Sequence, residues 1–324
     1  MLKYYFWAVG EKALSYVPFS PHLYYGLGYL VTRKSQRRLQ GCANSYRLAR
    51  KAKELTPPGG TIMDFGTAWH HHDAFLLYLI GDYKVYLFDV EDKAKFMYIK
   101  TYIEYLLENL ESVCSELSID QDVARGKLNE LLPLKSRRDI YRACNFELII
   151  TKTTDKPFLP EGSIDFIVSN CVLPHIPPHI MEPELGALRS MLKKDGYMYM
   201  MTGHDDHWAF HDASVNQFNY YKYSDEYYKA LFDTKFEYQN RFVKGEYLPI
   251  FDRARLEIVD YYGYVTEESR ANIRALPHLD ERFAKYPVDE LATIYSYFLL
   301  RRAPDVQQTS AGSSRAWPRE QSRA

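Results

Sequence analysis

Histidine and aspartate side chains gather between residues 203 and 245 of the 324-residue chain. A histidine beside a carboxylate can remove a proton from a hydroxyl group, because the imidazole pKa lies close to 7 and the carboxylate orients the ring. We predict that His207 is such a base, oriented by Asp206 or Asp212, and that His175 is the second candidate. The chemistry that this region favours is therefore proton removal from an acceptor group.

The same region could also bind a metal ion, because imidazole and carboxylate groups are common ligands of divalent cations. No helical HExxH-like motif accompanies these residues, so the predicted set of site residues contains no metal ligand. The run from His70 to Asp73 could bind a metal ion for the same reason. Consecutive residues on a helix do not face one point, so we expect this run to begin a helix and to line a ligand.

A second group of candidate residues follows two expected strands. Asp64 and Gly66 lie at the end of a strand over residues 61–65, and Asp89 ends a strand over residues 84–89. An acidic side chain at the end of the second strand typically accepts hydrogen bonds from both hydroxyls of a ribose. The dinucleotide motif Gly-x-Gly-x-x-Gly is missing, which argues against a bound NAD and leaves an NAD-type oxidoreductase as an alternative only.

The order of expected elements predicts an α/β fold with a doubly wound, Rossmann-like, seven-stranded sheet. Five strands alternate with helices, and two late strands over residues 256–262 and 292–301 would form an antiparallel hairpin at one edge. We expect an amino-terminal helical extension over residues 1–58, a main domain over 59–303, and a disordered tail over 304–324. The main domain would contain a helical insert of two or three helices at 92–144 and an acceptor lid at 203–245.

Several motifs together resemble those of class I S-adenosylmethionine-dependent methyltransferases. Asp64-Phe65-Gly66-Thr67-Ala68 is similar to the first motif of that family, with Ala68 and His70 in place of two glycines. The stretch from Gly162 to Ile176 and the turn from Leu188 to Tyr197 match two further motifs in order and spacing. The resemblance implies S-adenosyl-L-methionine as the cofactor, held by residues after the strands: Asp64, Gly66, Thr67, Asp89, Val90, Asn170 and Cys171.

The lid resembles a branch of these methyltransferases found with polysaccharide and glycan biosynthesis. The segments from Asp206 to Ser214, from Asn219 to Ser224 and from Tyr238 to Arg241 carry this likeness. It implies O-methylation of a sugar-containing or other small acceptor. The residues expected to bind that acceptor are His204, His211, Asp212, Asn219, Tyr223, Asn240 and Arg241. Departures such as Pro174 leave a cofactor-binding scaffold without catalysis as an alternative.

The bulk properties exclude one class of partner. A formal charge of −1 does not fit a nucleic-acid binder, which usually carries a basic excess. Four cysteines without paired spacing indicate reduced thiols, so we expect a cytoplasmic protein. No run of apolar residues is long enough to span a membrane, although the aromatic residues among 1–30 allow peripheral contact with one. The oligomeric state stays open.

Overall fold

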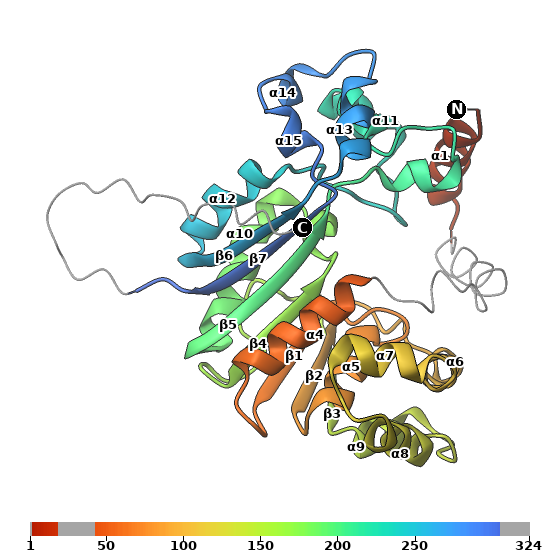
Figure 1. The fold of residues 1–324 in the computed structure, drawn as a ribbon. Coiled ribbons are helices and arrows are strands. Elements are labelled where there is room, and N and C mark those ends of the chain that lie inside the picture. Colours follow the sequence, from red (N-terminus) through yellow and green to blue (C-terminus); the bar gives the residue numbers. More distant parts are fainter. Residues whose placement is uncertain (1, 19–42, 305–324) are drawn as a thin grey trace, which may run out of the picture.

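The computed structural model describes residues 2–18 and 43–304. Within these ranges the chain forms one seven-stranded sheet in the order β3-β2-β1-β4-β5-β7-β6 (Figure 1). The first five strands are parallel, and β7 is antiparallel to both β5 and β6. The strands are β1 (Thr61–Phe65), β2 (Lys84–Asp89), β3 (Phe146–Ile150), β4 (Ile164–Asn170), β5 (Leu192–Gly203), β6 (Leu256–Tyr264) and β7 (Tyr295–Arg302). The predicted fold class is confirmed.

The central strands are apolar on both faces, as a sheet covered by helices on two sides requires. Along β4, Phe166 and Val168 pack into one hydrophobic cluster, while Ile164 and Ile167 pack into another. The first cluster contains α4 (Ala43–Leu55), α5 (His72–Ile80) and the inserted helices. The second contains α10 (Pro178–Met191) and α12 (Lys244–Arg253). The sheet is therefore the middle of three layers.

The helical insert contains more helices than predicted. Residues 92–144 are all described and form α6 (Phe96–Glu108), α7 (Leu110–Leu117), α8 (Gln121–Leu131) and α9 (Arg137–Ala143), where two or three helices were expected. Asp120 and Ser136 cap α8 and α9 by accepting hydrogen bonds from backbone N–H groups in the first turn. These two caps divide a charged stretch whose hydrophobic periodicity alone shows no boundary.

The lid is built from three separate parts of the chain. One aromatic cluster joins α1 (Leu2–Ser15), the stretch after β5, and the helices between β6 and β7. Those elements are η2 (His207–His211), η3 (Asn219–Lys222), α11 (Asp225–Leu231), α13 (Glu267–Arg274), α14 (Glu281–Ala284) and α15 (Val288–Leu291). Figure 1 shows α1, α11, α13, α14 and α15 together beyond one end of the sheet. The predicted lid at 203–245 is thus one part of a larger unit.

The amino-terminal helix α1 belongs to this unit through buried contacts. Tyr4 is fully buried, and its hydroxyl donates a hydrogen bond of 2.8 Å to Asp206. The predicted extension at 1–58 therefore splits between two places, because α4 packs on the sheet while α1 packs on the lid. The predicted tail, apart from Pro304, lies outside the described residues, as do Tyr24 and Tyr25 among the aromatic residues expected near a membrane.

None of the helices in residues 2–18 and 43–304 is long and apolar enough to cross a membrane.

Glu184 in α10 gives a prediction for the pH dependence of stability. Burial raises its pKa to about 7 from an ordinary value of 4.5. Between those values the unfolded chain ionises this carboxyl and the folded chain does not, so stability is present below pH 4.5 and is lost as pH rises through 7. Relative to Glu184→Gln, the wild type should lose on the order of 3 kcal/mol of unfolding free energy between pH 4.5 and 8.

Urea unfolding at several pH values measures this difference. Glu182→Gln, on the same helix, is the matched control because Glu182 is half exposed and pairs with Arg253. Its curve should run parallel to that of the wild type. Parallel curves for Glu184→Gln would contradict the raised pKa.

Candidate active site

The carboxyl ends of β1, β2, β4 and β5 meet at one edge of the sheet because these strands are parallel. The strand order reverses between β1 and β4, and ligands of doubly wound sheets bind outside such a reversal. Asp64, Asp89 and Asn170 lie in the last two positions of β1, β2 and β4. The structure therefore brings the predicted cofactor residues to one edge.

Gly66 makes the sharp turn after β1. Its φ is +88°, and a Cβ atom there would lie 2.2 Å from Cγ2 of Val172. The N–H groups of Gly66 and Thr67 both donate to the carbonyl of Phe88 at 2.9 Å. Glycine is required at this position by both its backbone conformation and its close neighbour. The turn ties the end of β1 to the end of β2.

Asp64 lies in a buried acidic group at this edge. It is 1% exposed and accepts a hydrogen bond of 2.7 Å from the Thr67 hydroxyl. Burial raises the pKa of Asp64, and the neighbouring charge of Asp73 raises it further. The Asn170 amide donates to Asp73 at 3.1 Å and to Ser45 at 3.0 Å. The carbonyl oxygen of Asn170 is buried without a hydrogen-bond partner among the described residues.

Asp89 ends β2 and holds the neighbouring loops. Its carboxylate accepts hydrogen bonds from the backbone N–H groups of Ala68 at 3.0 Å and Glu91 at 3.2 Å. A carboxylate has about four acceptor positions, so it can accept further hydrogen bonds. Val90 follows with its apolar side chain 42% exposed. Cys171, after β4, has a positive φ of 57° and continues the edge.

The histidine run begins α5, as predicted. The helix starts at His72, and His71 has a left-handed conformation at the N-cap. His71 is buried between Thr67 and Tyr141, with its two ring nitrogens 2.7 Å and 2.6 Å from their hydroxyls. Burial lowers the pKa of His71 to about 4, so the ring is neutral at pH 7. This residue supports the turn that follows β1.

Two predicted catalytic histidines meet beside the ends of β4 and β5. His175 lies in η1 (Leu173–His175) after β4, and His207 begins η2 after β5. Their ring centroids are 5.1 Å apart. Oε1 of Glu237 lies 2.8 Å from Nδ1 of His207 and 3.7 Å from Nδ1 of His175. We call these three residues the His–His–Glu cluster.

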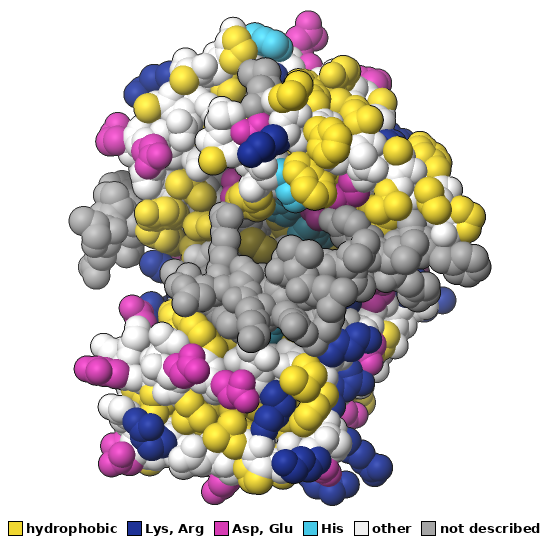
Figure 2. All heavy atoms as spheres, turned by 90° about the vertical axis from the view of Figure 1, so that its right-hand side faces the viewer, with side chains coloured by type: hydrophobic (Ala, Val, Ile, Leu, Met, Phe, Trp, Pro, Cys, Tyr) yellow, Lys and Arg dark blue, Asp and Glu magenta, His cyan; other side chains and the backbone are white. Residues whose placement is uncertain are grey.

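The cluster is polar and accessible. The side chain of His175 is 42% exposed, that of His207 18% and that of Glu237 30%. Burial lowers the pKa of His207, but the hydrogen bond that its ring donates to Glu237 and the negative charges of Glu237, Asp205 and Asp206 together outweigh burial, so the His207 pKa is raised. Burial of the ring lowers the pKa of His175. Figure 2 shows histidine and acidic side chains together in the hollowed middle of one face, below a region rich in hydrophobic side chains.

The carboxylate partner of His207 is therefore Glu237, which corrects the predicted role of Asp206 and Asp212. Asp206 is fully buried and caps η2 by accepting from the N–H of Trp208 at 3.0 Å. Its other oxygen accepts from Tyr4. Asp212 accepts hydrogen bonds from the backbone and the hydroxyl of Ser214. Asp206 is thus used to cap η2, and Asp212 is used by the turn at Ser214.

Most of the predicted acceptor-binding residues hold the lid together. His204 is 1% exposed, with its ring nitrogens 2.8 Å from the carbonyl of Phe242 and 2.9 Å from the Ser296 hydroxyl. Asn219 donates to the Tyr223 hydroxyl at 3.2 Å. His204, Asn219 and Tyr223 therefore have hydrogen-bond partners inside the lid. Of the predicted set, His211 is exposed and stacks on Trp7, with ring centroids 5.3 Å apart.

Asn240 braces the loop that carries His175. Its amide donates to the carbonyls of Leu173 at 2.7 Å and Ile176 at 3.1 Å. Its backbone N–H donates to Pro174 at 2.8 Å. These three bonds surround His175 in the sequence, so Asn240 positions η1. Asn240 also lines a pocket on the lid, so this supporting role stands beside the predicted role in acceptor binding.

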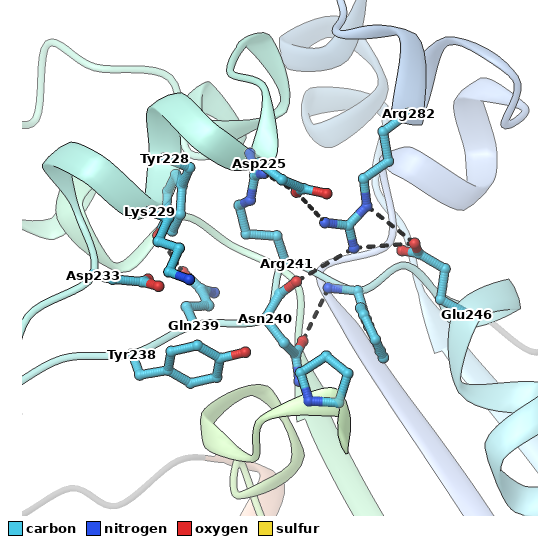
Figure 3. A pocket seen from close by; sticks show the side chains of 12 residues that line it. Asp225, Tyr228, Lys229, Asp233, Tyr238, Gln239, Asn240, Arg241, Glu246 and Arg282 are labelled. Carbon is cyan, nitrogen blue, oxygen red and sulfur yellow. Dashed lines mark hydrogen bonds and ion pairs between the residues drawn. The ribbon is translucent and has the colours of Figure 1, made fainter. Parts of the chain in front are cut away.

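Arg241 faces a pocket of about 390 Å³ on the lid (Figure 3). Its guanidinium donates to the carbonyls of Tyr220 and Tyr223 and pairs with Asp225. Arg282 pairs with Asp225 and with Glu246 at 3.0 Å. Both arginines are thus paired with acids. Figure 3 shows the Tyr238 ring directed into the pocket, and the carbonyl of Tyr238 lies 2.9 Å from Nδ1 of His175.

Sequence reasoning missed Glu237, and it considered Asp73 only as the last residue of the histidine run. Glu237 directly precedes the Tyr238–Arg241 motif, and Asp73 follows the histidine run, so both stand beside residues that were singled out. Neither belongs to a motif by itself. Their proximity to the site comes from the packing of the lid and of α5, which no local spacing encodes.

A family model described as "Methyltransferase domain" matches residues 35–257, more than half of the chain. The chain belongs to the methyltransferase domain family. It is an S-adenosylmethionine-dependent methyltransferase, and S-adenosyl-L-methionine is its cofactor. The alternative of an NAD-type oxidoreductase is thereby set aside. No curated protein matches the chain significantly.

The solved methyltransferase structures that are similar to this chain have low sequence identity to it. A TehB-like SAM-dependent methyltransferase from Corynebacterium glutamicum is 13% identical with a TM-score of 0.39, over 79% of this chain and 86% of that chain. Geranyl diphosphate C-methyltransferase from Streptomyces coelicolor is 8% identical with a TM-score of 0.45, over 80% and 78%. A 1,6-didemethyltoxoflavin-N1-methyltransferase from Burkholderia thailandensis is 12% identical with a TM-score of 0.44, over 88% and 91%.

The edge residues of this methyltransferase fit its cofactor. Asp64 and Asp73 form no ion pair with a lysine or arginine of the described ranges, and the unpartnered oxygen of Asn170 lies beside them. These acceptors suit the ammonium of the methionine part. Asp89 has acceptor capacity for the ribose, and the exposed Val90 offers an apolar contact for the adenine. The predicted cofactor residues are therefore chemically suited to the group.

Removing the Asp89 carboxylate should weaken cofactor binding. Asp89→Asn is expected to lower the affinity for S-adenosylhomocysteine more than about tenfold, because hydrogen bonds to a charged acceptor are lost. Isothermal titration calorimetry measures this change. Asp92→Asn is the matched control, since Asp92 lies three residues further and pairs with Arg137 at the surface. Equal affinities for Asp89→Asn and the wild type would place the ribose elsewhere.

Proposed function

We propose that this methyltransferase transfers a methyl group to a hydroxyl oxygen of a small, sugar-containing acceptor. The observation that carries the proposal is the His–His–Glu cluster beside the ends of β4 and β5. The acceptor hydroxyl must lie next to the cofactor, and its proton must leave during or after attack. Two imidazoles and a carboxylate at this edge are groups that can bind that hydroxyl and accept its proton.

Each residue of the site would have a role that follows from its position. S-adenosylmethionine supplies a methyl group activated on a sulfonium sulfur. Asp64 and Asn170 would hold its methionine part, and Asp89 its ribose. His175 and His207 would hold the acceptor hydroxyl in line with the methyl group and accept its proton. Glu237 fixes the ring of His207, and the Tyr238 carbonyl fixes the ring of His175. The contribution of the protein is alignment and proton removal.

The pocket in Figure 3 supports a hydroxyl-rich acceptor. It shares Tyr238 and Gln239 with the segment that carries Glu237. Tyrosine rings offer apolar faces with a hydroxyl, and the amides of Gln239 and Asn240 and the paired charges line the remaining wall. Such a lining has no excess of either charge, because three acids face three cations. A neutral sugar ring fits it better than a phosphate does.

The proposal includes the cellular location and the partners of the enzyme. Cys114, Cys144 and Cys171 are free thiols, which supports a reducing, cytoplasmic location. On α1, Phe6 is 73% exposed and Trp7 48%, which supports peripheral contact with a membrane. The formal charge of −1 does not favour a nucleic acid as partner.

Transfer of a labelled methyl group tests the function. We expect the enzyme with deuterated-methyl S-adenosylmethionine to label the hydroxyl of a member of a panel of free and nucleotide-linked sugars, detected by mass spectrometry. His207→Ala should lower the rate at least about a hundredfold while keeping affinity for S-adenosylhomocysteine. His179→Ala, which removes an exposed histidine near η1, is the control.

Two results would count against the proposal. Labelling of amine or carbon acceptors with no labelled sugar would remove the hydroxyl assignment. Full activity of His207→Ala on a labelled sugar would separate the cluster from the chemistry.

A further inference from the structure

We propose that His175, His207 and Glu237 bind one divalent transition-metal ion, Zn²⁺ by preference. One potential ligand atom of each residue lies within 4.8 Å of those of the other two. Two imidazoles with one carboxylate and an open position form a donor set found in catalytic zinc sites. Metal binding is independent of the proposed function, whereas the catalytic use of the metal rests on it.

The spacing of the cluster suits such an ion after a small adjustment. Ligand atoms about 2.1 Å from a tetrahedral Zn²⁺ lie about 3.4 Å from one another. The Glu237 oxygen lies 2.8 Å from Nδ1 of His207, which is shorter than that value, and the candidate ligand atoms of all three residues lie within 4.8 Å of one another. A metal ion would replace the proton now shared by His207 and Glu237. Adjustment of three loop side chains would then complete the site.

The supporting contacts resemble those around metal-bound histidines. The Tyr238 carbonyl lies 2.9 Å from Nδ1 of His175 and accepts its N–H, which leaves Nε2 with a free lone pair. A backbone carbonyl in this role typically fixes the orientation of a ligating imidazole. Asn240 holds the same loop by two hydrogen bonds to its carbonyls. His175 is therefore oriented by groups outside the cluster.

Charge and access also favour a cation. Three separate loops, after β4, β5 and α11, bring the ligands together, so no single helix or turn accounts for the cluster. The negative charges of Glu237, Asp205 and Asp206 all act on His207. The side chain of His175 is 42% exposed, which leaves room for a further ligand from solvent or acceptor. This is the open position that a catalytic site keeps.

The metal would activate the acceptor hydroxyl. With both rings bound to the metal, the histidines would act through it and not as bases. The hydroxyl oxygen would take the open position and lose its proton to solvent, because coordination to Zn²⁺ lowers the pKa of a bound O–H group. The resulting alkoxide oxygen forms a bond to the methyl carbon as the carbon–sulfur bond breaks. The products are the methyl ether and S-adenosylhomocysteine, which keeps the electron pair of the broken bond.

Calorimetric titration with Zn²⁺ tests the site directly. The full-length protein without an affinity tag is stripped with EDTA, dialysed and titrated with Zn²⁺ alone. We expect one Zn²⁺ per chain, with affinity lowered more than about tenfold in His207→Ala and in Glu237→Gln. His179→Ala, with its exposed histidine removed, should bind as the wild type does. Unchanged circular dichroism and S-adenosylhomocysteine affinity show that each variant is folded.

Cobalt gives an independent readout. Co²⁺ bound in a tetrahedral site absorbs visible light strongly, and we expect this absorption in the wild type and its loss in His207→Ala. Absence of Zn²⁺ binding by the wild type, or equal binding by His207→Ala, would overturn the site and leave a hydrogen-bonded cluster. Zn²⁺ binding without methylation of any hydroxyl would support the site and contradict the proposed function instead. Methylation unaffected by EDTA would overturn the catalytic role of the metal.

Discussion

Parallel pairing of the central strands is the constraint on which the rest of the structure depends. It forces the carboxyl ends of β1, β2, β4 and β5 to one edge, and the reversal of strand order between β1 and β4 opens a place for a ligand there. Because both faces of these strands are buried under helices, polar side chains can gather only at the strand ends. Asp64, Asp89 and Asn170 stand at these ends for that reason.

The same edge explains how the lid reaches the chemistry. Asn240 hydrogen-bonds to the carbonyls on both sides of His175, so the loop after β4 takes its shape from a residue far along the chain. The lid is in turn held by a buried aromatic cluster that includes Tyr4 of α1. A change in the amino-terminal helix therefore acts on Asp206, which caps the short helix that begins at His207.

The sequence allowed the sheet to be predicted, and with it the position of the expected cofactor residues at one edge, because their signals are local. Apolar runs, the turn at Gly66 and the acid after β2 each depend on neighbouring residues. The partner of His207 could not be predicted in this way, since Glu237 approaches it only after the lid folds. Asp206 and Asp212 were nearer in sequence, but capping and backbone contacts use their oxygens. The three-part lid escaped prediction for the same reason, because α1 and α13 join it through distant packing.

A crystal structure of the complex with S-adenosylhomocysteine tests the central claim most directly, namely that the cofactor edge and the His–His–Glu cluster form one active site. The claim predicts the ribose on Asp89, the methionine ammonium beside Asp64 and Asn170, and the sulfur atom facing His175 and His207. A ligand bound at this edge with its sulfur turned away from the cluster, or bound in the pocket of Figure 3, would contradict it.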